Sequence, residues 1–261
     1  MKNTENAAQP VIDKPLTIPA YSKWNAEELA NGTPNDFMKM LYHRAKNIGD
    51  DLYDSRTYEF ITLPPEVYRE NLILYMRRRA WSEWWFGTVS PARQITLLSD
   101  DHVELKLRLA RQIRDEMRHY DVFAAQLRRF GEEPRIADFQ LPQILVQMQK
   151  IQLETETASE LAATNQFAGE IVLSSMTDLE TSIFIRLFDE ELMNAIRDIE
   201  ADEPPHIANG RDLVLLFCET SEQRRRLAVA QEKYLKAMMQ LHVTEIVKLG
   251  CRRVKPLPIF E

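Results

Sequence analysis

Two short segments of the sequence carry metal-binding side chains and repeat at a fixed distance. Residues 115–119 read Asp-Glu-Met-Arg-His and residues 202–206 read Asp-Glu-Pro-Pro-His, so the glutamate and the histidine recur 87 positions later. A further glutamate precedes each segment's glutamate by 33 positions, at Glu83 and at Glu170, which are again 87 apart. Carboxylates combined with imidazoles suit iron or manganese. We therefore predict one two-metal site formed by Glu83, Glu116, His119, Glu170, Glu203 and His206.

The spacing of these residues is that of packed helices. Residues three apart are neighbours on one helix face, so the glutamate and the histidine of each segment can hold one ion together. A helix that runs away from Glu83 for about fourteen residues, turns and comes back returns to the same height at Glu116. One glutamate from each of two helices plus Glu-x-x-His from two others is the ligand pattern of di-iron and di-manganese bundles. Glu200, one turn before Glu203, is a candidate seventh carboxylate, although its counterpart in the first half, Ile113, is apolar.

The elements that must position these ligands are predicted to be helices. Apolar positions recur at helical spacing and the chain has only seven glycines, which indicates an all-α protein. Ser90-Pro91 and Ser99 are predicted to begin helices after turns. Thr177 is predicted to open a helix through a capping box with Glu180. The predicted helices cover 24–30, 34–48, 65–89, 100–130, 143–176, 188–218 and 221–247.

Two prolines stand inside the second metal segment. Neither Pro204 nor Pro205 can donate the N–H that a continuous helix would use. Two alternatives stay open: the helix kinks there, or one helix ends near Glu200 and another begins at the prolines. Both leave Glu203 and His206 close together. As a hypothesis, carbonyls freed near Glu200 would bind water or a ligand, and the break would then shape access to the metals.

Two other clusters receive structural interpretations. The run 77–79, Arg-Arg-Arg, is expected to be a solvated face or a salt-bridge partner. Three tryptophans within five residues, Trp81, Trp84 and Trp85, are expected to supply core or interface mass, with the wall of a substrate cavity or an electron relay as the alternative.

Length, charge and cysteine content set outer limits. We predict an extended arm over residues 1–20 and a single helical domain over 21–261, with its bundle core at about 64–218. A net charge of −7 and a pI near 5.4 argue against nucleic acid as the main partner. No apolar run approaches a membrane span, so we expect no membrane partner and a cytoplasmic location. Cys218 and Cys251 are too few and too far apart for a disulfide framework or a zinc site.

Four stretches between about residues 60 and 210 match a known family pattern: Pro65-Glu66-Val67-Tyr68-Arg69, Ser82-Glu83 with Gly87, Asp115-Glu116-x-x-His119 and Glu203-x-x-His206. On these residues the chain resembles the ferritin-like di-iron carboxylate oxygenases. Within that family it is most similar to the catalytic subunit of phenylacetyl-CoA epoxidase and its relatives. The metal segments are shared across the superfamily, so they are specific for the type of site and not for the substrate. Trp84-Trp85 and Pro204-Pro205 depart from that subgroup.

The resemblance implies a fold, cofactors and roles for the acidic residues. The implied fold is a ferritin-like four-helix bundle with additional peripheral helices. The implied cofactors are two iron ions, with manganese as the alternative metal, and O2 is the implied co-substrate. The glutamates of the two repeated segments would bridge the metals, and Glu83 and Glu170 would be terminal ligands. Asp115 and Asp202 would accept the far N–H groups of the ligand histidines; helix-surface charge is the alternative for these two aspartates.

The leading functional hypothesis is an O2-dependent oxygenase of the hydroxylase or epoxidase type. It would act on a small organic substrate, with a thioester as one candidate. Electrons would come from a separate reductase, because the chain has no Gly-rich dinucleotide fingerprint and no cysteine cluster for iron–sulfur. The alternatives are a di-metal oxidase or oxidative bond-cleaving enzyme, a ferroxidase that handles iron, and a structural subunit of an oxygenase complex. Bundles of this kind often pair through exposed helix faces, so the candidate assemblies are a homodimer and a hetero-oligomer.

Overall fold

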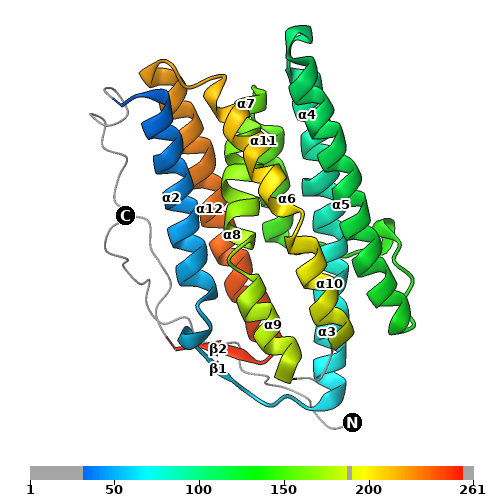
Figure 1. Cartoon of the computed structure of the whole chain (residues 1–261). Coiled ribbons are helices and arrows are strands. Elements are labelled where there is room, and N and C mark those ends of the chain that lie inside the picture. Colours follow the sequence, from blue (N-terminus) through cyan, green and yellow to red (C-terminus); the bar gives the residue numbers. More distant parts are fainter. Residues whose placement is uncertain (1–31, 187–189, 255–261) are drawn as a thin grey trace.

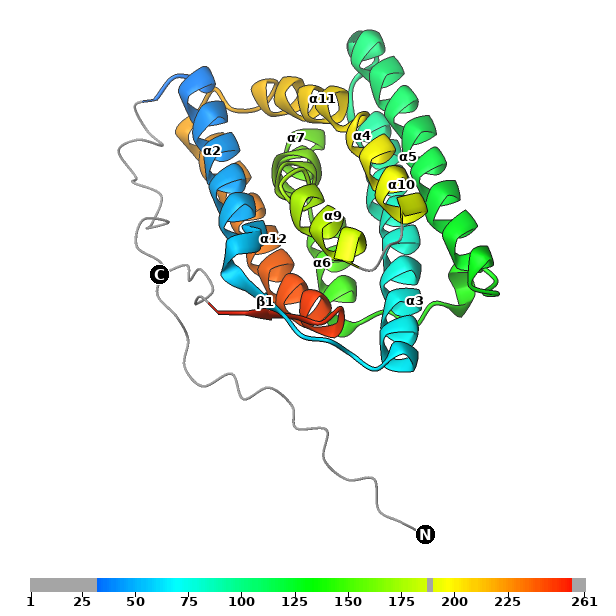
Figure 2. The same ribbon diagram turned by 60° about the horizontal axis from the view of Figure 1, so that its bottom comes forward.

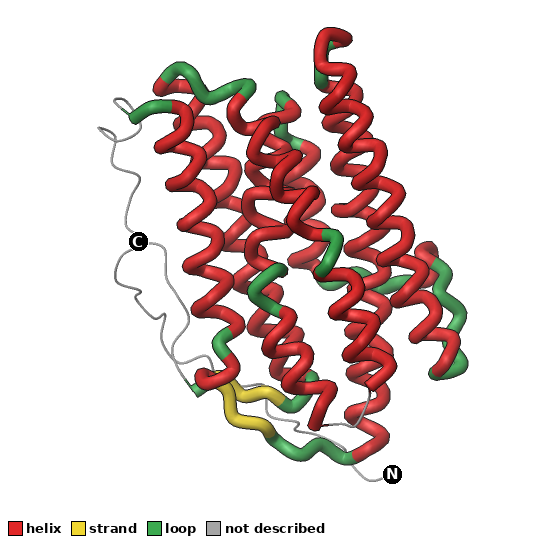
Figure 3. Tube along the Cα trace, viewed as in Figure 1, coloured by secondary structure: helices red, strands yellow, loops and turns green. Residues whose placement is uncertain are grey.

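Long helices packed side by side form almost all of the structure (Figures 1 and 3). The computed structural model describes residues 32–186 and 190–254. It confirms the predicted all-α class, while the predicted arm over 1–20 and helix over 24–30 lie outside the described residues. None of the helices in the described part of the chain is long and apolar enough to cross a membrane. The helices are α2 (Pro34–Tyr53), α3 (Pro65–Ser82), α4 (Ser90–Leu97), α5 (Val103–Arg129), α6 (Gln143–Leu153), α7 (Ala158–Thr164), α8 (Ile171–Leu173), α9 (Thr177–Arg186), α10 (Glu190–Glu200), α11 (Glu203–Leu215) and α12 (Ser221–Lys248).

The first long helix continues further than predicted. A π-helical turn over Glu83–Val89 joins α3 directly to α4, so the helical path runs to Leu97. The turn and the Ser90 cap predicted at Ser90-Pro91 are therefore wrong, although α4 itself does begin at Ser90. The Ser90 N–H donates to the Trp85 carbonyl within the π turn, and Pro91 follows where the pairing changes from π to α, so the chain continues without a turn. The reversal comes later, at Leu98 and Ser99, and α5 then returns along α3.

The predicted helix over 143–176 is divided. It ends with α6 at Leu153 and restarts with α7, because Thr157 accepts the Glu160 N–H while the Glu160 carboxylate accepts the Thr157 N–H. This capping box satisfies amide groups that a helix start leaves unpaired. A π-helical segment over Asn165–Glu170 then connects α7 to α8.

The predicted capping box at Thr177 is also wrong. Thr177 is itself the first residue of α9. The Glu180 carboxylate, which the capping box would direct at the backbone, instead lies 3.1 Å from Arg79 Nη1 on α3. A buried ion pair between two helices has therefore taken the place of a local cap.

The region of the two prolines follows the second of the two alternatives. α10 ends at Glu200, Ala201 and Asp202 form a turn, and α11 begins at Glu203. Proline is accepted in the first turn of a helix, where its missing N–H has no intrahelical partner to lose. Asp202 thus stands at the break itself.

The remaining helices enclose this arrangement. α2 opens through the predicted cap at Thr33, and α12 covers the predicted final helix. In the turned view of Figure 2, α7 lies between α2 and α12 on one side and α5 and α10 on the other. Two short strands missed by the sequence analysis, β1 (Tyr58–Phe60) and β2 (Cys251–Arg253), pair antiparallel and tie the approach to α3 to the end of α12. One buried apolar cluster extends from Phe37 to Cys251.

Candidate metal centre

The six predicted ligand residues lie on four neighbouring stretches of helix. Glu83 opens the π turn after α3, and Glu170 closes the π segment after α7. The remaining four come as the two Glu-x-x-His pairs, one in the middle of α5 and one in the first turn of α11. Five of the six are buried and Glu83 is partly buried; Glu116 is 2 % exposed and His119 is fully buried.

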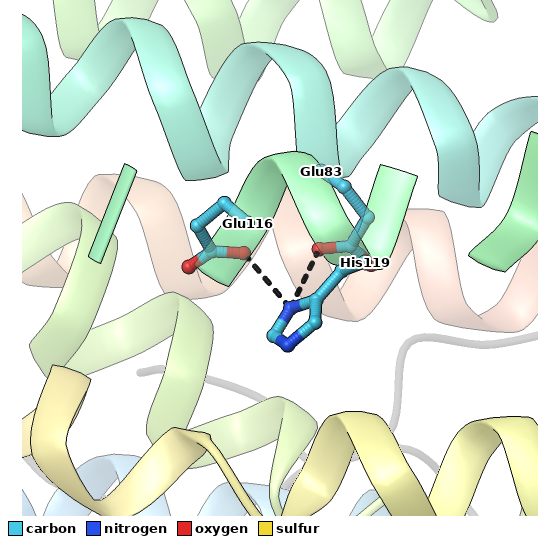
Figure 4. Close-up of side chains that lie close together, drawn as sticks. All are labelled: Glu83, Glu116 and His119. Atoms are coloured by element: carbon cyan, nitrogen blue, oxygen red, sulfur yellow. Dashed lines mark hydrogen bonds and ion pairs between the residues drawn. The ribbon is translucent and has the colours of Figure 1, made fainter. Parts of the chain in front are cut away.

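The first half of the site brings together Glu83, Glu116 and His119 (Figure 4). One ligand atom from each of these residues lies within 4.8 Å of the other two. His119 Nδ1 lies 3.2 Å from Glu116 Oε2 and 4.0 Å from Glu83 Oε2. Both carboxylates therefore face the same imidazole nitrogen.

The second half brings together Glu116, Glu170 and His206, whose ligand atoms again lie within 4.8 Å of one another. His206 Nδ1 lies 3.1 Å from Glu116 Oε1. Glu116 therefore belongs to both clusters, with one carboxylate oxygen toward each histidine.

Glu203 also lies between these two histidines. Its Oε2 is 3.4 Å from His206 Nδ1 and its Oε1 is 3.9 Å from His119 Nδ1. The two imidazole rings are 6.1 Å apart, centre to centre. Two carboxylates thus span the space between the imidazoles, and Glu83 and Glu170 add one further carboxylate on each side.

The two aspartates of the repeated segments lie behind the histidines, and they cross between the halves. His119 Nε2 lies 3.2 Å from Oδ2 of Asp202, which belongs to the second segment. His206 Nε2 lies 3.8 Å from Oδ2 of Asp115, which belongs to the first. Arg118 also pairs with Asp202. Each imidazole therefore presents Nδ1 to the glutamates and Nε2 to an aspartate of the other half.

Burial and crowding of charge shift the pKa values in this cluster. Burial by itself would raise the pKa of Glu116, but the neighbouring imidazoles of His119 and His206 outweigh it and hold that pKa well below its usual range. Burial by itself would lower the pKa values of both histidines. The surrounding carboxylates outweigh it, with Glu116 contributing most, and raise the pKa of His119 to about 9 and that of His206 to about 10. Glu116 and the two histidines therefore favour each other's charged forms.

The outer glutamates are shifted the other way. Burial raises the pKa of Glu83 to about 7, against a lowering influence from Arg79. Burial, followed by the charges of Glu203 and Glu116, raises the pKa of Glu170 well above its usual range. Several carboxyl groups forced together in a water-poor interior cannot all ionise unless cations join them.

Several buried atoms of the cluster lack a hydrogen bond of acceptable geometry to the described residues, even where, as for His206 Nδ1 and Glu116 Oε1, they lie 3.1 Å apart. They are Glu116 Oε1, Glu203 Oε2 and both ring nitrogens of His206. Buried polar atoms in proteins are nearly always satisfied, so atoms of this kind call for a bound partner. Oxygen and imidazole donors that converge in this way suit a hard or intermediate divalent cation. The residues present therefore fit a two-metal site.

Three features of the site were missed from the sequence. Both π-helical segments adjoin the outer glutamates, and wide turns of this kind are frequent at functional sites. Gly87 lies against Glu116, where a side chain would not fit. Arg79, expected in a solvated run or a salt bridge, is buried and contacts both Glu83 and Glu180. For Arg79 the predicted salt bridge is confirmed, and the alternative of a solvated face is not.

Glu200, the candidate seventh carboxylate, lies outside both ligand clusters. It is exposed and lines one side of a cavity of about 30 Å³ beside the site. The same cavity is lined by three of the glutamates, Glu83, Glu170 and Glu203, and by residues of α9 and α10.

Comparison with protein-family models, with curated proteins and with solved structures finds no match for this chain.

Proposed function

We propose that this chain is a ferritin-like di-iron carboxylate protein that catalyses an O2-dependent oxidation of a small organic substrate. The observation that carries the proposal is the pair of buried histidines joined by two shared glutamates, Glu116 and Glu203. The four helices of the bundle would be α3 with its π turn, α5, the stretch from α7 to α8, and α10 with α11. Electrons would come from a separate reductase.

Six side chains of mixed type favour iron, with manganese as the alternative. Structural zinc sites are usually closed by four ligands and are often rich in cysteine. Here four carboxylates and two imidazoles converge, while the two cysteines, Cys218 and Cys251, are buried elsewhere in the chain. Four glutamates also match the charge of two divalent ions, which stabilises both the metals and the buried carboxylates.

The residues around the ligands would orient them. Asp202 and Asp115 would accept the Nε2–H groups of the histidines, which leaves each Nδ1 free to bind metal and raises its basicity. The buried apolar residues Phe123 and Phe167 exclude bulk water from the interior. When bound, the two iron ions would supply the redox chemistry that activates O2 for transfer to the substrate.

The cavity beside the site constrains what can reach it. A volume of about 30 Å³ accommodates a molecule of the size of water or O2 but no organic substrate. Its walls are formed on one side by Ile196, Ile199 and Glu200 of α10, which ends at the break before α11.

The metal centre is tested first by metal content. Protein purified from iron-fed cells should hold about two metal ions per chain, and Glu116→Gln should lose both because this carboxylate belongs to both clusters. Glu104→Gln is the matched control, at an exposed position of the same helix. Full metal retention in the Glu116 variant would refute the assignment, and fewer than about one metal per wild-type chain would favour a structural subunit.

The reaction class is tested by O2 consumption. The reduced, iron-loaded protein should consume O2 repeatedly with a chemical reductant and a suitable organic substrate, and the product should carry oxygen from labelled O2. Consumption that depends only on added Fe(II) would indicate iron handling instead. Labelled oxygen that appears only in water would indicate an oxidase.

A further inference from the structure

The two halves of the candidate site differ at one pair of equivalent positions. Arg79 stands four residues before Glu83, and Gln166 stands four residues before Glu170, so these two are also 87 positions apart. Both side chains are buried, with Arg79 6 % exposed and Gln166 fully covered. A permanently charged group in one half thus corresponds to a neutral amide in the other.

Arg79 is held beside Glu83 by three contacts. Its Nη2 lies 3.2 Å from Glu83 Oε1 and its Nη1 lies 3.1 Å from Glu180 Oε1. The guanidinium carbon also lies 4.9 Å from the ring centre of Phe123. Arginine does not lose its proton in proteins, so this positive charge is fixed in place. Glu180, which is 1 % exposed, offsets part of it.

Gln166 belongs to a buried group of hydrogen-bonded amide side chains. It exchanges two hydrogen bonds with Gln94, at 2.8 Å and 3.0 Å, and its Nε2 lies 3.4 Å from Gln112 Oε1. Asn209 also donates to that Gln112 oxygen. Glu170 makes no ion pair with an arginine or lysine of the described residues. The amides thus place no charge at the position that corresponds to Arg79.

We propose that Arg79 makes the two metal positions unequal, so that the position at Glu83 and His119 binds divalent cations more weakly than the position at Glu170 and His206. The inference rests on the proposed metal centre. A cation that binds Glu83 must share a carboxylate already paired with a guanidinium, and it meets a like charge. With Glu180 as partial compensation, this difference corresponds to about tenfold in affinity or more. Arg79 acts through Glu83 and is a positioning residue.

The test is an anaerobic titration of the metal-free full-length protein with Co(II), followed by its visible absorbance. The wild type should bind two equivalents in two phases, separated by about tenfold or more in Kd. Glu83→Ala should remove the weaker phase, and Glu170→Ala should remove the tighter one. These two variants assign each phase to a position.

The chain itself supplies a matched variant for the charge. The double substitution Arg79→Gln with Glu180→Gln replaces the ion pair by two amides, as in the Gln166–Gln94 pair of the other half. It should bring the two affinities within about threefold of each other, whereas Arg79→Lys, which keeps the charge, should retain the gap. If Arg79 acted through packing alone, Arg79→Lys would instead lose the difference between the two affinities, since lysine cannot reproduce the contact of arginine with both glutamates.

Three results would overturn the proposal: two equal affinities in the wild type, loss of the tighter phase in Glu83→Ala, or a gap that persists in the folded double variant. If the double variant does not fold, the wild-type phases and the two glutamate variants still decide the order of filling. A wild type that binds no Co(II) at all would refute the metal centre itself, a result distinct from two equal sites.

Discussion

Gly87 lies directly against Glu116, the carboxylate common to both ligand clusters. A β-carbon at Gly87 would lie 2.6 Å from Glu116 Oε2 and 2.8 Å from its Cβ, closer than side-chain carbons approach other atoms. The π turn carries Gly87 and α5 carries Glu116, so this contact sets how closely the two helical paths meet at the site. The absence of a side chain at residue 87 is therefore a requirement of the site.

Gly87→Ala should displace Glu116 and weaken metal binding. We expect a loss of about 1–3 kcal/mol in the free energy of unfolding from overpacking, together with a loss of metal stoichiometry. Gly169→Ala is the matched control, because a β-carbon there would meet the Thr164 carbonyl oxygen at 3.7 Å and a Tyr234 ring carbon at 3.9 Å, which are ordinary contacts. Thermal unfolding and metal analysis of both variants measure the effect; equal behaviour of the two would contradict the argument.

Asp202→Asn should weaken metal binding at His119. The aspartate oxygen lies 3.2 Å from His119 Nε2, and loss of such a partner typically reduces metal affinity by about 10–100-fold. Asp115→Asn should have a smaller effect, because its oxygen lies 3.8 Å from His206 Nε2. Metal titration of the two variants gives the comparison, with the exposed Asp121→Asn on α5 as control. A larger loss in the Asp115 variant would contradict the order.

His242 should make the fold sensitive to acid. Burial lowers the pKa of His242 to about 3, and its ring lies against Tyr53 and Tyr58. Unfolding exposes the imidazole, which then binds a proton below about pH 6.5. The unfolded state therefore gains protons first, and stability falls by roughly 1 kcal/mol for each pH unit below that point until the pH approaches 3.

The substitution His242→Gln tests this dependence. The glutamine keeps a hydrogen-bonding group near Tyr58 but does not titrate, so the loss of melting temperature between pH 7 and pH 5 should be smaller than in the wild type. His43→Gln, at an exposed position of α2, serves as the control. Parallel pH curves for wild type and His242→Gln would show that another group is responsible.

Thr157→Ala should remove the cap of α7. The Thr157 hydroxyl accepts the Glu160 N–H at 3.1 Å, and loss of a cap of this kind usually costs about 1 kcal/mol. For a chain of this size that is about 2–4 °C in melting temperature. The exposed Thr62→Ala should leave the melting temperature unchanged. Equal melting temperatures for all three proteins would argue that tertiary packing alone starts α7.

The convergence of the six predicted ligand residues could be predicted from the sequence because it follows from helix geometry. A rise of 1.5 Å per residue and 3.6 residues per turn place residues three apart on one face, and they bring residues 33 apart back to one height across an antiparallel pair. The equal spacing of Glu83 and Glu116, and of Glu170 and Glu203, therefore predicts that these four glutamates lie near one another.

Other features depend on contacts that spacing does not contain. The π turns at Glu83 and Glu170 arise where helices must adapt to one another, and no local pattern marks them. Glu180 has the sequence context of a capping residue, but a buried arginine on another helix competes for its carboxylate. The break before α7 did have a local signal, the capping pattern from Thr157 to Glu160, which the long apolar period concealed.

Each aspartate of the repeated segments contacts the histidine of the other segment, so the two contacts are related in the way that a twofold axis relates two contacts. Asp202 approaches the imidazole of the first half, and Asp115 approaches that of the second. In a symmetric dimer, a residue of each subunit reaches across to the same place on its partner in just this way. The two contacts are thus reciprocal, and each imidazole depends on an aspartate that the other half of the same polypeptide supplies.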